Sequence, residues 1–202
     1  MQNSEIPVYF ITGAPGSGKG TQAHLLQDRL GFLHVSSGDV FRNAIERKDS
    51  AAMMAKDLMV RGELVPDDLI ETMVHDELAV LIKQHPDARG VILDGFPRTL
   101  EQAEMVEDML KDLPVNFRGM INLHVPQQNV VDRLRRRAEI EHRPDDTEDV
   151  ILERLRIWQE KTKPLERYYS ERNQLITVDG EGHTEEVYSR LVPILLDNNG
   201  AN

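Results

Sequence analysis

A glycine-rich segment near the start of the chain, GAPGSGKGTQ at residues 13–22, has the composition of a phosphate-binding loop. Gly13, Gly18 and Lys19 fit the spacing G-x-x-x-x-G-K. Glycines let the backbone turn its N–H groups toward an anion, and the start of a following helix adds a partial positive charge. The alternative, a tight strand–helix turn with a surface lysine, is disfavoured by the apolar run before the loop and the helical pattern after it.

A second segment, GVILDGFPR at residues 90–98, ends an apolar run with an acid and a turn. An aspartate such as Asp94, at a strand end beside a phosphate loop, is the usual way to hold Mg²⁺. The planar guanidinium of Arg98 can hold a phosphate with several donors. Taken singly, the aspartate could be a capping residue and the arginine an ordinary surface residue. Together at one strand end, they favour a second site that handles phosphate.

A third candidate is a run of arginines in residues 132–156 of an otherwise acidic chain. Two of them lie four apart and therefore share a helix face, and two more follow in the next loop and helix. A solvated helix face is the ordinary explanation of such a run, and it suffices for Arg135 and Arg136. If the two helices are antiparallel, four side chains can converge as phosphoryl transfer requires: Arg133, Arg137, Arg143 and Arg154.

Short apolar strands alternate with helical patterns along the chain and must position these residues. Such alternation predicts a parallel sheet covered by helices on both faces. Ligands of these sheets bind beyond the carboxyl ends of the strands, where the glycine-rich loop and Asp94 both fall. The expected strands are residues 8–12, 33–36, 91–93, 120–125 and 175–178.

The helices are expected between these strands. The stretch after the second strand is helical, with interruptions at Gly62 and Pro66. Residues 146–169 are compatible with one long helix, and core packing explains Trp158 within it better than a site does. The other expected helices are residues 20–30, 100–110, 128–138 and 185–196.

Bulk composition limits the classes of protein to consider. A chain of 202 residues with 40% hydrophobic residues suits one compact domain. The net charge of −11 argues against nucleic acid or an anionic membrane as partner. The absence of cysteine fits a reducing cytoplasm, and we expect neither a signal peptide nor a membrane span. No heptad seam stands out, so a monomer is expected.

Together these motifs resemble those of the adenylate kinases, a family of nucleoside monophosphate kinases. The glycine-rich loop alone is shared by many nucleotide-binding proteins, whereas DGFPR with its downstream glutamine is far more specific. The likeness covers essentially the whole chain. Its motifs come in the family's order: GAPGSGKGTQ, SSGDVFR, GELVPD, DGFPRTLEQ, RLRRR, RPDD and VDGEG.

The resemblance implies an α/β fold of three layers, the P-loop fold, with a five-stranded parallel sheet. It also implies a single domain over residues 1–202 with two mobile parts, a lobe for the nucleoside monophosphate at residues 36–65 and a lid at residues 138–143. The core would then be residues 1–35, 66–137 and 144–202. Members with a long lid often bind zinc there through cysteines. This chain is similar to the short-lid type, and we expect no zinc.

The resemblance also implies which residues bind ATP. The glycine-rich loop would surround the phosphates, including the glycine and threonine that follow the lysine in this family. Arg133 would lie against the adenine, Arg137 would reach the phosphates, and Gly182 would offer backbone to the adenine. The implied ATP-binding residues are Gly16, Ser17, Gly18, Lys19, Gly20, Thr21, Arg133, Arg137 and Gly182.

AMP would bind on the other side of the cleft. Arg42 and Arg98 would contact its phosphate, and Gln102 would hydrogen-bond the edge of its adenine. Ser37 stands where threonine is more usual, and its hydroxyl keeps the polar group. The implied AMP-binding residues are Ser37, Arg42, Glu63, Leu64, Val65, Gly95, Phe96, Pro97, Arg98, Gln102, Arg143 and Arg154.

By the same resemblance, the protein would transfer the terminal phosphoryl group of MgATP to AMP and form two ADP. Asp94 would order the waters around Mg²⁺, with Asp39 as a second candidate. One alternative is a UMP/CMP kinase of the same fold, which Thr99 and Gln102 disfavour; another is a P-loop ATPase or nucleotide switch, which would need only one nucleotide site. The implied catalytic residues are Lys19, Arg98, Arg137, Arg143 and Arg154.

Overall fold

The computed structural model describes residues 5–141 and 147–196. Its centre is a five-stranded sheet in the order β2-β3-β1-β4-β5, and all four ladders are parallel. This confirms the predicted fold class. The strands are β1 (Ile6–Thr12), β2 (Phe32–Ser36), β3 (Gly90–Asp94), β4 (Val115–His124) and β5 (Leu175–Asp179).

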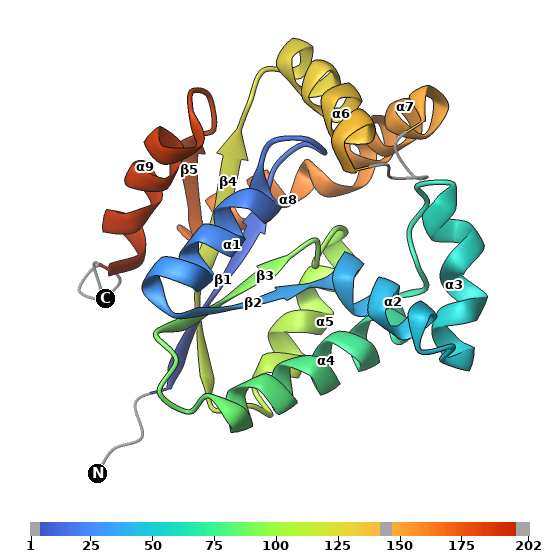
Figure 1. Cartoon of the computed structure of the whole chain (residues 1–202). Coiled ribbons are helices and arrows are strands. Elements are labelled where there is room, and N and C mark those ends of the chain that lie inside the picture. Colours follow the sequence, from blue (N-terminus) through green and yellow to red (C-terminus); the bar gives the residue numbers. More distant parts are fainter. Residues whose placement is uncertain (1–4, 142–146, 197–202) are drawn as a thin grey trace.

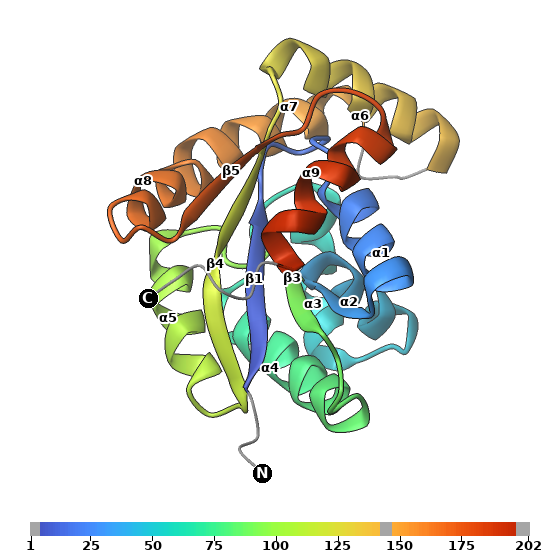
Figure 2. The ribbon, with the colours of Figure 1, turned by 90° about the vertical axis from the view of Figure 1, so that its left-hand side faces the viewer.

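Helices cover both faces of the sheet because each strand carries apolar side chains on both sides. In β1, Val8 and Phe10 join one hydrophobic cluster, whereas Tyr9 and Ile11 join another on the opposite face. The first cluster packs under α4 (Asp67–Gln84), α5 (Leu100–Leu110) and α8 (Pro164–Ser170), and the second under α1 (Lys19–Leu30) and α9 (Thr184–Leu196). Figures 1 and 2 show these three layers.

Four further helices lie around the carboxyl end of the sheet. The pair α2 (Ser37–Glu46) and α3 (Ser50–Val60) forms the lobe that follows β2, and α6 (Gln127–Glu141) and α7 (Glu148–Ile157) lie at the top of Figure 1. The ladder register pairs Asp94 with both Ser36 and Ile11. The ends of β2, β3 and β1 are therefore level, and the segments that leave them start side by side.

Two expected elements differ from the structure. The strand expected at residues 120–125 begins earlier, at Val115, because its polar first half pairs with β1. The long helix expected at residues 146–169 is divided by a π-helical turn at Trp158–Thr162. Pro164 has no N–H to continue the α-helical ladder, and Lys163 N–H donates instead to Trp158 O at 2.8 Å. Position 146 lies outside the described residues.

The interruptions predicted in the stretch after β2 are confirmed. Helix α3 ends just before Gly62, and α4 begins directly after Pro66. Helix α4 buries one stripe of side chains four residues apart, which holds it on the sheet: Ile70, Val74, Leu78 and Ile82. Within the described residues, no helix is both long and apolar enough to cross a membrane.

Candidate active site

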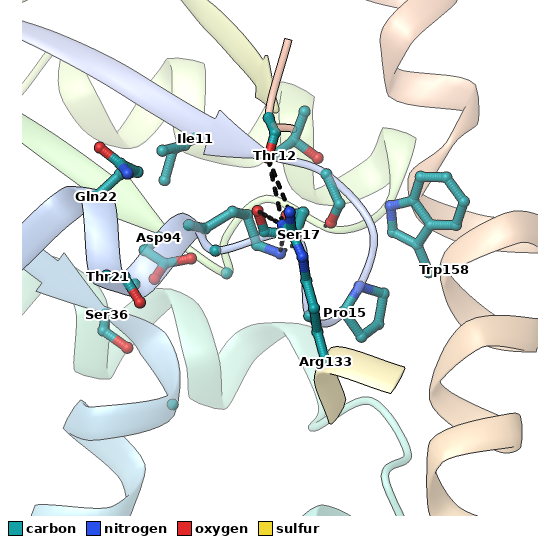
Figure 3. Close-up of a pocket in the computed structure, with 18 of the residues that line it drawn as sticks. Ile11, Thr12, Pro15, Ser17, Thr21, Gln22, Ser36, Asp94, Arg133 and Trp158 are labelled. Carbon is teal, nitrogen blue, oxygen red and sulfur yellow. Dashed lines mark hydrogen bonds between the residues drawn. The ribbon is translucent and has the colours of Figure 1, made fainter. Parts of the chain in front are cut away.

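A cleft of about 820 Å³ opens at the carboxyl ends of β1 and β3. It is lined by the glycine-rich loop after β1, the turn after β3, the start of α2 and parts of α6 and α7. Figure 3 shows Asp94, Thr21 and Ser36 on one side of the loop, with Trp158 on the other. The volume lies within the usual range for small-molecule sites. The structure thus brings the loop and the DGFPR turn onto one cleft.

The lysine of the loop is held in place by backbone oxygens. Lys19 Nζ donates to Gly13 O at 2.9 Å and to Ala14 O at 3.1 Å. Helix α1 begins after Gly18, which has φ 99° and provides no side-chain cap. The first N–H groups of α1 therefore keep their capacity to bind an anion, next to a lysine ammonium that is already positioned.

The loop presses closely against α6. Gly16 has φ +84°, and a Cβ added there would lie 2.8 Å from Leu134 Cγ and 3.0 Å from Val130 O. Only glycine fits this position, for both reasons. Arg133, also on α6, donates to Ser17 O and to Gly180 O at 3.3 Å. This arginine therefore joins the loop to the segment after β5, as Figure 3 shows for Ser17.

That segment also lines the cleft. Gly180, Gly182 and Thr184 are all part of the wall. Arg190 Nη1 donates to Asp179 O at 2.8 Å and to Glu181 O at 2.6 Å. These contacts hold the backbone beside Gly182, where the family resemblance expects the ATP adenine.

Gln22 connects the same segment to the glycine-rich loop. Its Nε2 donates to Thr184 O at 2.9 Å, and its side chain is buried in the first turns of α1. The loop motif includes Gln22, but its spacing predicts no contact for this side chain.

Asp94 ends β3 with its carboxylate close to a histidine and within reach of the charges of Lys19 and Arg98. His34 Nε2 lies 3.5 Å from Asp94 Oδ2, which is a close electrostatic contact. Burial alone would raise the pKa of Asp94, but His34, Lys19 and Arg98 outweigh burial and hold this pKa below its ordinary value. Asp94 is therefore a carboxylate at neutral pH. Sequence reasoning missed His34, although it is the one ionisable residue in the apolar run FLHVS.

The lowered pKa of Asp94 predicts how its contribution to stability depends on pH. Above the unfolded-state pKa of about 3.9, the carboxylate stabilises the fold through His34, Lys19 and Arg98, and this contribution is lost as the pH falls through the folded-state pKa. Asp94→Asn should lower the free energy of unfolding by about 1–3 kcal/mol at pH 7. The difference from wild type should shrink below about pH 4, as measured by urea unfolding. A difference in unfolding free energy that stayed constant or grew as the pH fell would contradict this assignment. The control is Asp112→Asn, at an exposed position, which should differ little from wild type both at pH 7 and below about pH 4.

The turn after Asp94 positions Arg98. Arg98 Nε donates to Gly95 O at 2.6 Å, and Gly95, Pro97 and Arg98 line the cleft. Burial lowers the pKa of Arg98, while Asp94 acts to raise it. A guanidinium keeps its charge at neutral pH even so. Phe96 is 2% exposed, packs in a hydrophobic cluster and is not part of the cleft wall, so its contact with AMP remains a prediction.

Gln102 lies just behind this turn and is only 1% exposed. Its Oε1 accepts from Arg98 N at 2.7 Å, and its Nε2 donates to Asp67 Oδ1 at 2.6 Å. Thr99 caps α5 by accepting from Gln102 N at 3.1 Å. Gln102 is not part of the cleft wall in this structure, so contact with an adenine remains a prediction.

The start of α2 contributes a second group of polar side chains. Ser37 is 2% exposed, and within the described structure its Oγ has no hydrogen-bond partner. Arg42 forms an ion pair with Asp39, and both line the cleft. Burial acts to raise the pKa of Asp39, but the opposite effects of Arg42 and Ser36 are together larger. The pKa of Asp39 therefore lies below its ordinary value. Asp39 is therefore a carboxylate at neutral pH, next to Arg42 on the cleft wall.

The segment after α3 approaches the cleft at one residue only. Gly62 lines the cleft, whereas Glu63, Leu64 and Val65 do not, and the Glu63 carboxylate pairs with Arg61 at 2.6 Å. Gly62 has φ +74°, and a Cβ there would lie 2.7 Å from Cγ of an arginine on α7, Arg154. The lobe formed by α2 and α3 is thus in contact with α7.

The arginine run divides among several places. Arg133 and Arg154 line the cleft as expected. Arg136 also lines the cleft, although a solvated helix face was the only role that the sequence predicted for it. Arg135 pairs with Glu148 at 2.7 Å on the surface. Helix α6 includes position 137, but the side chain of Arg137 and all of Arg143 lie outside the described residues.

Trp158 lies between the core and the cleft, a position that the sequence did not reveal. It packs against a hydrophobic cluster, as expected, but it also lines the cleft. Its Nε1 is buried and has no partner among the described residues. No sequence signal distinguished this face of the indole ring from core packing.

The described residues include no group of three or more His, Asp or Glu side chains placed to hold a metal ion. Asp94 and Asp39 each lie on the cleft wall as carboxylates with lowered pKa. Oxygen ligands of this kind suit Mg²⁺ that keeps most of its waters. The residues therefore fit a magnesium ion that arrives with a nucleotide.

Comparisons with known proteins agree with this geometry. Residues 11–174 match the family model described as adenylate kinase. The chain is similar to proteins named adenylate kinase from Thermus thermophilus, at 43% identity covering 91% of this chain and 94% of that one, and from Thermobifida fusca, at 42% identity covering 92% and 96%. A third, from Rhodococcus erythropolis, is 41% identical, covering 92% and 97%. The chain therefore belongs to the adenylate kinase family.

Proposed function

We propose that the protein catalyses the reversible transfer of the terminal phosphoryl group from MgATP to AMP, which yields two ADP and balances the adenine nucleotide pool. The family to which the chain belongs consists of ATP:AMP phosphotransferases. One observation carries the proposal for this site. Lys19, Asp94 and Arg98 come from two adjacent strand ends and line one cleft.

On the ATP side, the loop backbone and Lys19 would bind the phosphates. Arg133 and Gly182 would lie against the adenine, and Arg137 would reach the phosphates. The contacts from Arg133 to the loop and to the segment after β5 support this assignment, because they join the two expected parts of the ATP site. The remaining proposed ATP contacts are Gly16, Ser17, Gly18, Gly20 and Thr21.

On the AMP side, Arg42 and Arg98 would bind the phosphate, and Gln102 would read the base. Arg143 and Arg154 would bridge the two substrates. The contact between Gly62 and Arg154 supports this arrangement, because it brings α7 against the expected AMP lobe. The remaining proposed contacts are Ser37, Gly95, Phe96 and Pro97, and the backbone of Glu63, Leu64 and Val65.

Asp94, with Asp39 as the second candidate, would hold the waters of Mg²⁺, and no zinc is proposed. When bound with ATP, Mg²⁺ would offset negative charge on the β- and γ-phosphates. The lowered pKa values of the two carboxyl groups support this role, since both side chains are then available as oxygen ligands.

In the proposed reaction, an oxygen of the AMP phosphate forms a bond to the γ-phosphorus. The bond from that phosphorus to the bridging oxygen breaks, and ADP leaves. No general base is needed, because the attacking oxygen is already ionised. The remaining work is to position the substrates and to stabilise charge on the equatorial oxygens, for which the five proposed catalytic residues supply cations: Lys19, Arg98, Arg137, Arg143 and Arg154.

Water is a competing acceptor of the phosphoryl group. We propose that the lobe at residues 36–65 closes on AMP and the lid at residues 138–143 closes on ATP, with the rest of the single domain as a fixed core. Closure on both substrates would exclude water before the reaction. The acidic, cysteine-free composition supports a cytoplasmic protein without nucleic acid or membrane as partner, and the lack of a heptad seam in the sequence supports a monomer.

The test is phosphorylation of AMP, CMP, UMP and GMP with MgATP, with nucleoside diphosphate and free phosphate measured separately. AMP-dependent formation of ADP with little free phosphate is expected. Preference for UMP or CMP would instead assign the chain to the UMP/CMP kinases. Phosphate release that no monophosphate changes would indicate an ATPase or switch.

Base reading by Gln102 gives a further prediction. Gln102→Ala should lower kcat/KM for AMP relative to the other monophosphates by roughly tenfold, the effect of about one lost hydrogen bond. The change also leaves Asp67 and Arg98 N without their partner, so activities should be compared well below the melting temperature of the variant. Gln27→Ala, at an exposed position of α1, is the matched control. An unchanged base preference in Gln102→Ala would remove Gln102 from the AMP site.

A further inference from the structure

Asp67, the first residue of α4, reaches across to α5 and contacts a buried carboxamide. Its Oδ1 accepts from Gln102 Nε2 at 2.6 Å, although the two residues are 35 positions apart. Gln102 is 1% exposed, whereas Asp67 is half-buried. A buried polar side chain with a short, specific contact is held in one orientation.

The two partners of Gln102 also fix which end of its carboxamide faces which way. Arg98 N–H can only donate, and it faces Oε1 at 2.7 Å. The Asp67 carboxylate can only accept, and it faces Nε2. Rotation of the carboxamide by 180° would place Oε1 against the carboxylate and Nε2 against the Arg98 N–H. Both contacts would then be repulsive, so Asp67 and the Arg98 backbone together exclude the rotated form.

This orientation has a consequence for the base that Gln102 can read. After its contacts with Arg98 and Asp67, the carboxamide retains one acceptor position on Oε1 and one N–H on Nε2. A 6-aminopurine presents an amino donor beside the N1 acceptor, which matches this pair. A 6-oxopurine presents an O6 acceptor beside an N1–H donor, which requires the rotated carboxamide.

We propose that Asp67 is a positioning residue for base selection, which fixes the Gln102 carboxamide to accept 6-amino bases and reject 6-oxo bases. The inference rests on the proposed function, in which Gln102 reads the base of AMP. Asp67 itself does not line the cleft and need not touch the nucleotide. Its effect passes through the orientation of one side chain.

The test compares AMP with IMP, which differ in the group at position 6 and in the proton on N1. Asp67→Asn keeps the shape of the side chain but can offer Gln102 either a C=O or an NH₂ group. The ratio of kcat/KM for AMP to that for IMP should fall about tenfold or more, mainly because IMP improves. Turnover with AMP should stay near the wild-type value.

Asp68→Asn is the matched control, because it removes the same charge from the same first turn of α4 at an exposed position. It should keep the wild-type ratio. Asp67→Asn should also leave the ratio unchanged in a Gln102→Ala background, where there is no carboxamide to orient. Asp67→Ser, whose hydroxyl can also donate or accept, replaces Asp67→Asn if the latter does not fold.

An Asp67 variant that kept the wild-type preference for AMP over IMP would overturn the inference and leave Asp67 a structural contact between α4 and α5. A change in the ratio that persisted without Gln102 would overturn it as well. Failure of the proposed function gives a different result, since the wild-type protein would then show no AMP-dependent phosphoryl transfer.

Discussion

Lys19→Met is expected to reduce kcat/KM for phosphoryl transfer by roughly 150- to 5,000-fold, which corresponds to about 3–5 kcal/mol of transition-state stabilisation. Two loop carbonyls, Gly13 O and Ala14 O, hold the Lys19 ammonium before any phosphate arrives. A charge that is already positioned costs little reorganisation during the reaction. Methionine has a similar length and flexibility but supplies no charge and no donor.

The measurement is steady-state kinetics with both MgATP and AMP varied, together with a thermal unfolding curve to establish that Lys19→Met is folded. Lys83→Met, at an exposed position in the last turn of α4, removes the same charge far from the cleft. It should remain close to wild type. If Lys19→Met kept kcat/KM within about threefold of wild type, the glycine-rich loop would not be the ATP site that we propose.

The sequence was sufficient to predict where the candidate site lies. Asp94 and the glycine-rich loop each follow an apolar run, and parallel strands bring such ends to one edge of a sheet. The ladder register bears this out, because Asp94 pairs with Ile11 on β1 and with Ser36 on β2. Periodicity therefore determines the site to within a residue or two at each strand end.

The partners of these residues could not be predicted in the same way. His34 faces Asp94 from the neighbouring strand, and Asp67 faces Gln102 from another helix. Both contacts depend on side-chain rotamers and on how elements pack, and local spacing carries no signal of either. Membership of a motif does not predict exposure either. Phe96 lies within the DGFPR motif, but its ring is buried in the core.

The division of the helix expected at residues 146–169 has a similar explanation. The apolar spacing continues through Trp158, so periodicity alone indicates one helix. Only the missing N–H of Pro164 signals a change, and its effect is a π-helical turn rather than a break. That turn begins at Trp158, which lines the cleft. A local departure from α-helical geometry thus coincides with the candidate site.

Arg98→Ala should reduce kcat/KM by a similar amount, about 3–5 kcal/mol, but its effect should be distributed differently between the substrates. Arg98 lies within the DGFPR turn, where its Nε donates to Gly95 O at 2.6 Å, and its charge acts on Asp94. The proposed contact is with the AMP phosphate. We therefore expect KM for AMP to rise more than KM for ATP, together with a fall in kcat. Arg98→Lys should recover only part of the loss, because an ammonium keeps the charge but not the planar set of donors.

Arg89→Ala provides the control, since Arg89 is exposed and lies just before the opposite end of the same strand, β3. It should leave both KM values and kcat near those of wild type. A rise confined to KM for ATP in Arg98→Ala would place Arg98 on the ATP side of the cleft. Near-normal kcat/KM in that variant would mean that the DGFPR turn positions the backbone without contributing a catalytic cation. Because Lys19 and Arg98 both lower the pKa of Asp94, Lys19→Met and Arg98→Ala should each raise that pKa. If the three groups act on one phosphoryl group, the losses of kcat/KM in the two single variants should not be additive in the double variant.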